Sequence, residues 1–314
     1  MSSSSEWRSF PAHPSAGRTG ADTPFFWVPT RLRRVLRPPI ESSLLYLERR
    51  RGPSADYGLP GGLRRVYLYH VRKTGGSSLF GSFLALGGED PRDVEERMGA
   101  SFLRTTTSGM YVFAGNLRRS LESGRYFFGY SHIPAHELRL PPDTFTVTVL
   151  RDPVKRAISY YSYLVAGDDP TVVQRVRDDE RRLSEGGFQA FLDRVPRRDL
   201  LCQLHMFSSG FSVGEAVDRL SRCSLVLATE HIDDGIAELN GRLGLRLALR
   251  RDRVTSFKAE LKADELDRLR DLMEPEYQMF EQLRPNTGGA APPRNGTSSS
   301  GVPDGGERAD HAES

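Results

Sequence analysis

Four short apolar runs punctuate the middle of the chain. Residues 66–69, 126–130, 145–150 and 225–228 are rich in aromatic, leucine and β-branched side chains. Runs of this length and composition predict buried strands. Each run ends at polar or glycine-containing residues, which are typical of the loops that follow strands.

Segments with helical periodicity lie between and after these runs. Apolar residues recur at helical spacing after the first run, in 154–165, in 232–243 and in 263–283. The stretch 171–220 alternates charged residues with apolar anchors, which favours further helices. Pro275 predicts a break in the last segment, because proline lacks the backbone N–H that a helix interior requires. Alternating strands and helices indicate an α/β core with a mostly parallel sheet.

The two ends of the chain differ from this core in composition. Residues 1–60 mix Ser, Pro, Gly and Arg, and residues 286–314 are rich in Gly, Pro, Ser, Asp and Glu. Segments of that kind bury too little apolar surface to fold alone. We therefore predict a partly disordered N-terminal extension over 1–60, one domain over 61–285 and a disordered tail over 286–314. Helical potential is also present in 94–98 and 116–122.

Charge and cysteine content argue against several classes of protein. A net charge of +3 over 314 residues provides no strong field for nucleic acid or a membrane surface. No apolar run is long enough to span a bilayer. The arginine run 49–51 is short and lacks interleaved aromatic residues, so a solvated face is favoured over a nucleic-acid arm. Two cysteines, Cys202 and Cys223, and the absence of a secretory signal pattern predict a cytoplasmic protein.

A basic, glycine-containing turn follows the first predicted strand. Residues 72–78 read Arg-Lys-Thr-Gly-Gly-Ser-Ser and lead into a predicted helix. Such a turn directs backbone N–H groups and the positive end of the helix toward an anion. Only four of the 44 basic residues are lysines, as a GC-rich bacterial genome would favour, so the lysine at position 73 is informative. Because this lysine precedes the glycines, the turn does not match the Walker A loop, in which the lysine follows the last glycine.

A second polar turn follows the third predicted strand. Arg151, Asp152 and Pro153 come directly after residues 145–150. Asp152 is a natural helix N-cap, and Pro153 suits the first helical position. Arg151 offers a bidentate fork to a phosphate, and Ser159, about two helical turns further on, offers a hydroxyl. In a parallel sheet both turns lie at the carboxyl edge, where open α/β folds bind their ligands.

The two turns together resemble the donor-binding motifs of sulfotransferases that use 3′-phosphoadenosine 5′-phosphosulfate (PAPS). Residues 70–79, HVRKTGGSSL, are similar to the 5′-phosphosulfate loop H-I-P-K-T-G-G-T-S-L. Residues 150–161, LRDPVKRAISYY, are similar to the 3′-phosphate motif L-R-D-P-V-x-R-x-x-S-x-Y. The likeness is to the carbohydrate-type branch, which includes heparan and uronyl sulfotransferases and bacterial relatives, and it covers residues 64–284. It implies an α/β, P-loop-like three-layer fold with a mostly parallel central sheet flanked by helices.

The resemblance also implies an activity, namely transfer of a sulfuryl group from PAPS to a hydroxyl of a carbohydrate or a glycosylated small molecule. Lys73 would donate to the oxygen that bridges sulfur and phosphorus as charge develops there, and no metal would be required. PAPS would be held by the two turns through Arg72, Lys73, Thr74, Gly75, Gly76, Ser77, Ser78, Arg151 and Ser159.

The acceptor hydroxyl must lose its proton, and His132 is the predicted general base. Residues 129–134, GYSHIP, follow the second predicted strand and resemble the G-H-x-P segment of the bacterial relatives. His136 and Glu137 are the alternatives on the same turn. Glu230 lies where the family has a Thr-Glu strand end, and it either orients a binding-site residue or the acceptor, or is structural.

The chain departs from the family pattern at three places. Arg72 replaces the usual proline and either contacts a phosphate or faces solvent. Ala135 replaces the usual aromatic residue, which weakens the transfer of acceptor specificity from the relatives. The asparagine expected in the donor-covering loop is absent, which leaves Thr255 and Ser256 as candidates there.

Three other functions remain as alternatives. A P-loop kinase or another nucleotide-dependent phosphotransferase would share the strand–turn–helix arrangement. A non-catalytic nucleotide-binding protein would use the same scaffold without transfer. A nucleic-acid binder built on the arginine runs would show a steep salt dependence of its affinity.

Overall fold

The computed structural model describes most of the predicted domain. The described residues are 58–86, 104–107, 110–114, 118–166, 178–249, 259 and 261–283. Several predictions lie outside the described residues, namely those for most of the N-terminal extension, for the helix at 94–98, for Thr255 and Ser256, and for the C-terminal tail.

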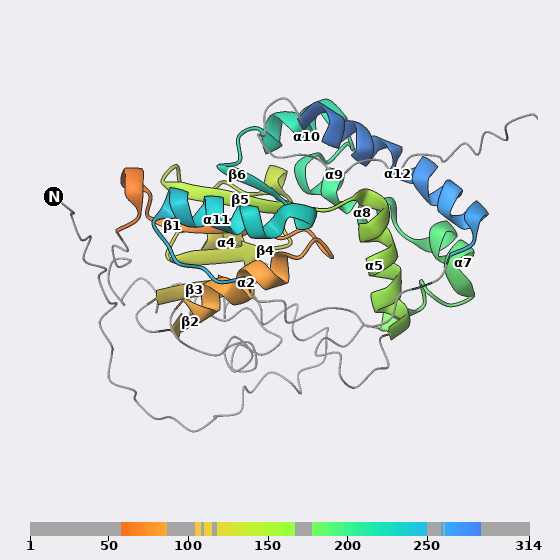
Figure 1. Cartoon of the computed structure of the whole chain (residues 1–314), viewed down its shortest axis with the longest axis horizontal. Helices are drawn as coiled ribbons and strands as arrows, with labels where there is room; N and C mark the ends of the chain where they lie inside the picture. The colour runs from red at the N-terminus through yellow and green to blue at the C-terminus, as the bar shows by residue number, and fades with distance from the viewer. Residues whose placement is uncertain are drawn as a thin grey trace, which may run out of the picture.

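A six-stranded sheet forms the centre of the described structure (Figure 1). Its strand order is β2-β3-β4-β1-β5-β6. The strands from β3 to β6 in this order run parallel, and β2 runs antiparallel to β3 at one edge. The predicted α/β fold with a mostly parallel central sheet is therefore confirmed. The strands are β1 (Arg65–Tyr69), β2 (Arg104–Thr107), β3 (Met110–Ala114), β4 (Phe128–Ser131), β5 (Thr144–Leu150) and β6 (Leu225–Ala228).

Helices pack on both faces of this sheet. Side chains of α2 and α11 share one hydrophobic core with the sheet, and side chains of α5, α7, α9, α10 and α12 share another. Figure 1 shows α11 drawn in front of the strands, with α10 along the top of the view, α5 and α7 at the right, and α12 running from the top toward the right. The described helices are α2 (Gly76–Ala85), α4 (Arg118–Glu122), α5 (Pro153–Val165), α6 (Asp178–Arg181), α7 (Gly187–Arg194), α8 (Arg197–Leu200), α9 (Cys202–Phe207), α10 (Val213–Leu220), α11 (Ile232–Leu243) and α12 (Ala263–Leu283), with 3-10 turns η1 (Pro60–Gly62), η2 (Ala135–Glu137) and η4 (Thr229–His231).

Strand β1 supplies side chains to both cores. Val66 and Leu68 belong to the core shared with α2 and α11, whereas Tyr67 and Tyr69 belong to the core shared with α5 and α9. Successive side chains of a strand point to opposite faces of the sheet. Because β1 is buried along its whole length, it anchors the loop that follows it from both sides.

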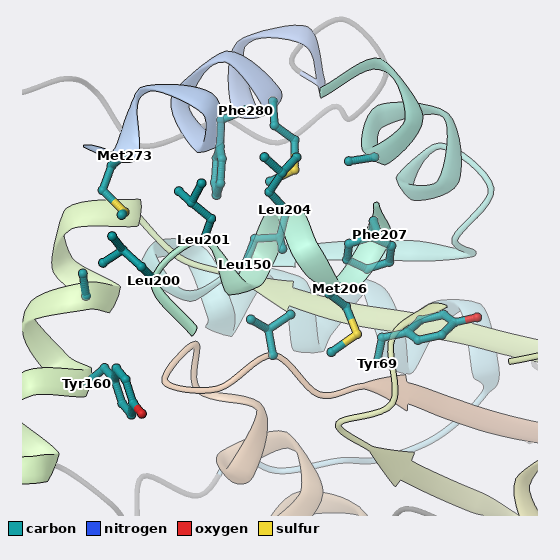
Figure 2. Packing of buried hydrophobic residues seen from close by; sticks show 14 of the residues in the cluster. Tyr69, Leu150, Tyr160, Leu200, Leu201, Leu204, Met206, Phe207, Met273 and Phe280 are labelled. Carbon is teal, nitrogen blue, oxygen red and sulfur yellow. The ribbon is translucent and has the colours of Figure 1, made fainter. Parts of the chain in front are cut away.

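The second core holds α9 and α12 near the end of β5. Figure 2 shows Leu204 of α9 and Phe280 of α12 lying together above Leu150, the last residue of β5. All three side chains are at most 7% exposed. This packing brings two helices from late in the chain next to the turn that begins at Arg151.

The structure differs from the predicted elements in two respects. The sequence did not predict β2 and β3, although the MYVFA run of β3 has the aromatic and β-branched composition of a strand. Helix α12 runs unbroken through Pro275 instead of breaking there. Tertiary packing overrides the local cost of the proline, because Met273 and Phe280 on either side of it are buried in the second core. Among the described helices, none has the length and apolar composition needed to cross a membrane.

Candidate functional site

Four loops meet along the carboxyl edge of the sheet. They follow β1, β4, β5 and β6, which are neighbours in the order β4-β1-β5-β6. The loops begin at His70, His132, Arg151 and Thr229. The structure therefore places the predicted lysine turn, the predicted base and the predicted arginine turn at one edge of the sheet, where ligands bind in open α/β folds.

Lys73 occupies an unusual backbone conformation in the turn after β1. Its φ is 67°, a left-handed value that favours glycine. Its carbonyl oxygen accepts a hydrogen bond from Nη1 of Arg151 at 3.2 Å. Such strain persists only where the surrounding contacts enforce it, and it clusters at functional sites. The lysine turn and the arginine turn are thus in direct contact.

Helix α2 begins directly after the lysine turn. Its N-cap, Gly75, has a φ of 86° and no side chain that could cap the first N–H groups of the helix. Ser77 and Ser78 lie half-buried in the first helical turn. Thr74 differs from them, because it is fully buried and its hydroxyl donates to the carbonyl oxygen of Val71 at 3.0 Å. The helix N–H groups and the two serines can bind an anion, whereas the Thr74 hydroxyl closes the turn.

Gly76 is packed tightly against His70. A Cβ atom at position 76 would lie 2.9 Å from Nε2 of His70 and closer still to Cδ2. The His70 ring is buried and stacks on His132, so it has little room to move. We expect Gly76→Ala to lower the free energy of unfolding by about 1–3 kcal/mol, the usual cost of overpacking.

Urea unfolding measures this effect, and a second substitution provides its control. His70→Ala in the same chain provides space for the new methyl group and should return part of the lost stability. A Gly76→Ala protein as stable as the wild type would contradict the contact.

Arg72, which replaces the family's proline, is held by protein groups. Its Nη1 donates to Oε1 of Glu180 in α6 at 2.9 Å. Its guanidinium lies 5.1 Å from the ring centroid of Tyr160 in α5. The structure thus gives Arg72 a role that neither predicted alternative included, which is to tie the lysine turn to α5 and α6. Phosphate binding therefore falls to the N–H groups of α2, Ser77 and Ser78 rather than to Arg72.

Side chains from outside the motif fix the arginine turn. The N–H of Arg151 donates to Oε1 of Gln203 at 2.8 Å, and the N–H of Asp152 donates to Oε1 of Glu230 at 3.1 Å. Asp152 caps α5 as predicted, since its Oδ1 accepts from the N–H of Lys155 at 2.8 Å. Burial lowers the pKa of Arg151, while Glu230 and Asp152 favour the charged form. An arginine remains a cation at neutral pH under these influences.

The end of β6 links the two turns. The hydroxyl of Thr229 contacts the carbonyl oxygens of Thr74 and, at 3.0 Å, of Leu150. Glu230 follows it and accepts from the arginine turn, as described above. Thr229 and Glu230 therefore position the two turns relative to each other.

His132 has the hydrogen-bonding pattern of a general base. Its Nδ1 lies 2.7 Å from the carbonyl oxygen of His70. Because a carbonyl oxygen only accepts, Nδ1 must carry the hydrogen, and the lone pair of the neutral ring is on Nε2. The residue as a whole is exposed to solvent. Neighbouring protein atoms desolvate the ring and lower the pKa of His132, the hydrogen bond to the His70 carbonyl oxygen raises it in part, and nearby Arg72 lowers it further. His132 is thus mostly neutral at pH 7.

The alternative bases have different surroundings. The ring of His136 in η2 lies 5.7 Å from that of His205 in α9, and its Nε2 lies 3.8 Å from Oε1 of Glu137. Burial lowers the pKa of His136. The Glu137 side chain is 54% exposed, so it faces solvent rather than a closed site.

Ser159 and Tyr163 lie one helical turn apart on the same face of α5. The ammonium of Lys73 lies 4.7 Å from the ring centroid of Tyr163, a cation–π contact. This contact turns the face of α5 that carries Ser159 toward the lysine turn. The sequence predicted Ser159 about two helical turns beyond Arg151 but gave no indication of the contact made by Tyr163.

The buried polar residues that support the arginine turn were not predicted from the sequence either. Gln203 and Glu276 are fully buried, and Tyr277 donates to Oδ2 of Asp152 at 3.1 Å. The available signal was a polar residue inside an apolar run, since Gln203 interrupts LLCQLHMF at 200–207. Such an interruption indicates a buried polar contact but does not identify the partner.

Comparisons with known proteins give distant structural similarity only. No protein-family model matches the chain, and no curated protein matches it. A crystal structure of a sulfotransferase from Alicyclobacillus acidocaldarius is 15% identical with a TM-score of 0.35, over 70% of this chain and 94% of that one. The mouse sulfotransferase SULT7A1 complexed with PAP is 12% identical with a TM-score of 0.33, over 81% of this chain and 73% of that one.

Proposed function

We propose that the protein transfers a sulfuryl group from PAPS to a hydroxyl group of a carbohydrate or a glycosylated small molecule. The observation that carries the proposal is the contact between two motifs with the residues of phosphate sites. The lysine turn after β1 and the arginine turn after β5 lie on adjacent strands, and Nη1 of Arg151 reaches the carbonyl oxygen of Lys73. A single nucleotide that carries phosphate groups on both the 3′ and the 5′ positions of its ribose could occupy both motifs.

The hydrogen-bond donors at the site suit the 5′-phosphate and the 3′-phosphate of PAPS. The N-terminal N–H groups of α2 and the hydroxyls of Ser77 and Ser78 would bind the 5′-phosphate. Arg151 would bind the 3′-phosphate through its planar fork, and Ser159 would add a hydroxyl from α5. When bound, PAPS supplies an activated sulfuryl group whose leaving group is adenosine 3′,5′-bisphosphate.

The residues at the edge of the sheet would accept the proton of the acceptor hydroxyl and stabilise the negative charge on the leaving oxygen. The acceptor oxygen forms a bond to sulfur while the bond from sulfur to the bridging oxygen breaks. Lys73 donates a hydrogen bond to that bridging oxygen as negative charge builds on it. Nε2 of His132 takes the proton from the acceptor hydroxyl. The products are a sulfate ester, adenosine 3′,5′-bisphosphate and a proton held by His132.

Incubation with PAPS and extracts of a bacterial host tests the proposal. Mass spectrometry should detect molecules that gain one sulfuryl group when the wild-type protein is present. Lys73→Ala protein supplies the blank, because the contact to Arg151 uses the backbone carbonyl oxygen of residue 73, whereas the substitution removes the donor to the leaving oxygen. If no molecule gains a sulfuryl group although the protein binds the bisphosphate, the chain is a non-catalytic nucleotide-binding protein and the proposed transfer is wrong.

A further inference from the structure

The backbone of Arg151 is held by a single carboxamide. Oε1 of Gln203 accepts from the Arg151 N–H at 2.8 Å, and Nε2 of Gln203 donates to the Arg151 carbonyl oxygen at 3.0 Å. Both backbone groups of the arginine are therefore bonded to one side chain from α9. The direction in which the Arg151 fork leaves the backbone depends on this pair of contacts.

Glu276 of α12 fixes that carboxamide in turn. Its Oε2 accepts from Nε2 of Gln203 at 2.7 Å, and its Oε1 accepts from the N–H groups of Gln203 at 2.8 Å and Leu204 at 3.2 Å. A carboxylate accepts only, so it dictates which end of the Gln203 amide donates. Neither Gln203 nor Glu276 is exposed to solvent.

The next residue of α12 reaches the same turn directly. The hydroxyl of Tyr277 donates to Oδ2 of Asp152 at 3.1 Å, while Oδ1 of Asp152 caps α5. Two consecutive residues of α12 thus act on two consecutive residues of the arginine turn. Figure 2 shows the apolar side chains that hold α9 and α12 together beside this turn.

Joining two helices through a buried carboxyl group costs free energy, because the charged form loses its hydration. Burial raises the pKa of Glu276, which reflects the cost of its charge, although buried Arg156 offsets part of that cost. Apolar side chains of similar volume commonly join helices with equal or greater stability. The polar network is better explained by the orientation that it imposes on the arginine turn.

We infer that Gln203, Glu276 and Tyr277 are positioning residues that aim the Arg151 fork at a 3′-phosphate, so that α9 and α12 determine the preference for nucleotides carrying that group. This inference rests on the proposed function and extends it to nucleotide selectivity. It assigns the second half of the chain a part in donor recognition, although these residues belong to neither phosphate motif.

Calorimetric titration of the full chain with two nucleotides tests the inference. Adenosine 3′,5′-bisphosphate probes both phosphate sites, and adenosine 5′-monophosphate probes the 5′ site alone. Tyr277→Phe removes one hydrogen bond to Asp152 and should weaken binding of the bisphosphate about three- to tenfold. Its affinity for the monophosphate should stay within twofold of the wild type. Gln203→Leu removes both contacts to Arg151. It should reduce the affinity for the bisphosphate relative to that for the monophosphate further.

Tyr126→Phe controls for the loss of a buried phenol hydroxyl, because Tyr126 is buried before β4, at the opposite end of the parallel strands from the arginine turn. It should leave the ratio unchanged. If Gln203→Leu does not fold, Tyr277→Phe decides the matter alone. An equal loss of affinity for both nucleotides, or no loss for either, would show a purely structural role and overturn the inference while leaving the proposed function standing. A wild-type protein with no preference for the bisphosphate would overturn both.

Discussion

Lys73→Ala should lower the rate of sulfuryl transfer by about two to three orders of magnitude, the usual effect of removing one donor that stabilises transition-state charge. Lys73 lies in a left-handed turn whose carbonyl oxygen is bonded to Arg151. Alanine keeps the backbone bond but loses the ammonium. Binding of adenosine 3′,5′-bisphosphate should change far less than the rate, because α2, Ser77, Ser78 and Arg151 still hold the phosphates.

Single-turnover rates with PAPS and titrations with the bisphosphate separate these two effects. Lys262→Ala is the control, since Lys262 is exposed next to α12 and belongs to neither turn. Lys73→Arg keeps the charge but replaces a compact donor by a planar fork, so we expect it to restore only part of the rate. Transfer by Lys73→Ala at the wild-type rate would exclude this lysine as the donor to the leaving oxygen.

His132→Gln should reduce the transfer rate by about two to four orders of magnitude, the range for loss of a general base. Desolvation lowers the pKa of His132, so the ring is mostly neutral at pH 7. It becomes protonated only at a pH below the ordinary histidine pKa of about 6.5. The ratio kcat/KM should therefore rise with pH through a limb that lies below about pH 6.5 and then level off. A base with a raised pKa would place that limb above this range.

The pH profile also distinguishes His132 from its neighbours. His136→Gln should keep both the rate and the acidic limb, because the ring of His136 packs against His205. His132→Gln should lose the limb together with the rate. Persistence of the limb in His132→Gln, or its loss in His136→Gln, would assign the base to another residue.

The elements with strong apolar periodicity or long apolar runs were predicted correctly from the sequence. Helix α11 begins and ends at the residues that the periodicity indicates, and β5 extends the predicted run by one residue. Strand β2 was missed because its sequence, RTTT, has no apolar alternation. Strand β3 was missed although MYVFA has the composition of a strand, because no partner strand was predicted beside it. The predicted break at Pro275 failed because burial of the surrounding helix outweighs the loss of one backbone hydrogen bond.

The candidate site was predictable to the extent that it follows the strands. Lys73, His132 and Arg151 come directly after runs that form neighbouring parallel strands, so their common location follows from the topology. The partners of these residues were not predictable. Glu180 pairs with Arg72, and Glu276 with Gln203, across long separations in the chain. Such pairings depend on how helices pack, and no spacing within a motif encodes them.

Calorimetry of the wild-type protein in the presence of EDTA is the most direct test of the central claim. We predict that adenosine 3′,5′-bisphosphate binds without any metal ion, and that it binds more tightly than adenosine 5′-monophosphate because Arg151 engages the additional phosphate. A P-loop kinase would instead bind ATP in a magnesium-dependent manner. Binding of Mg-ATP with no detectable binding of the bisphosphate would contradict the account.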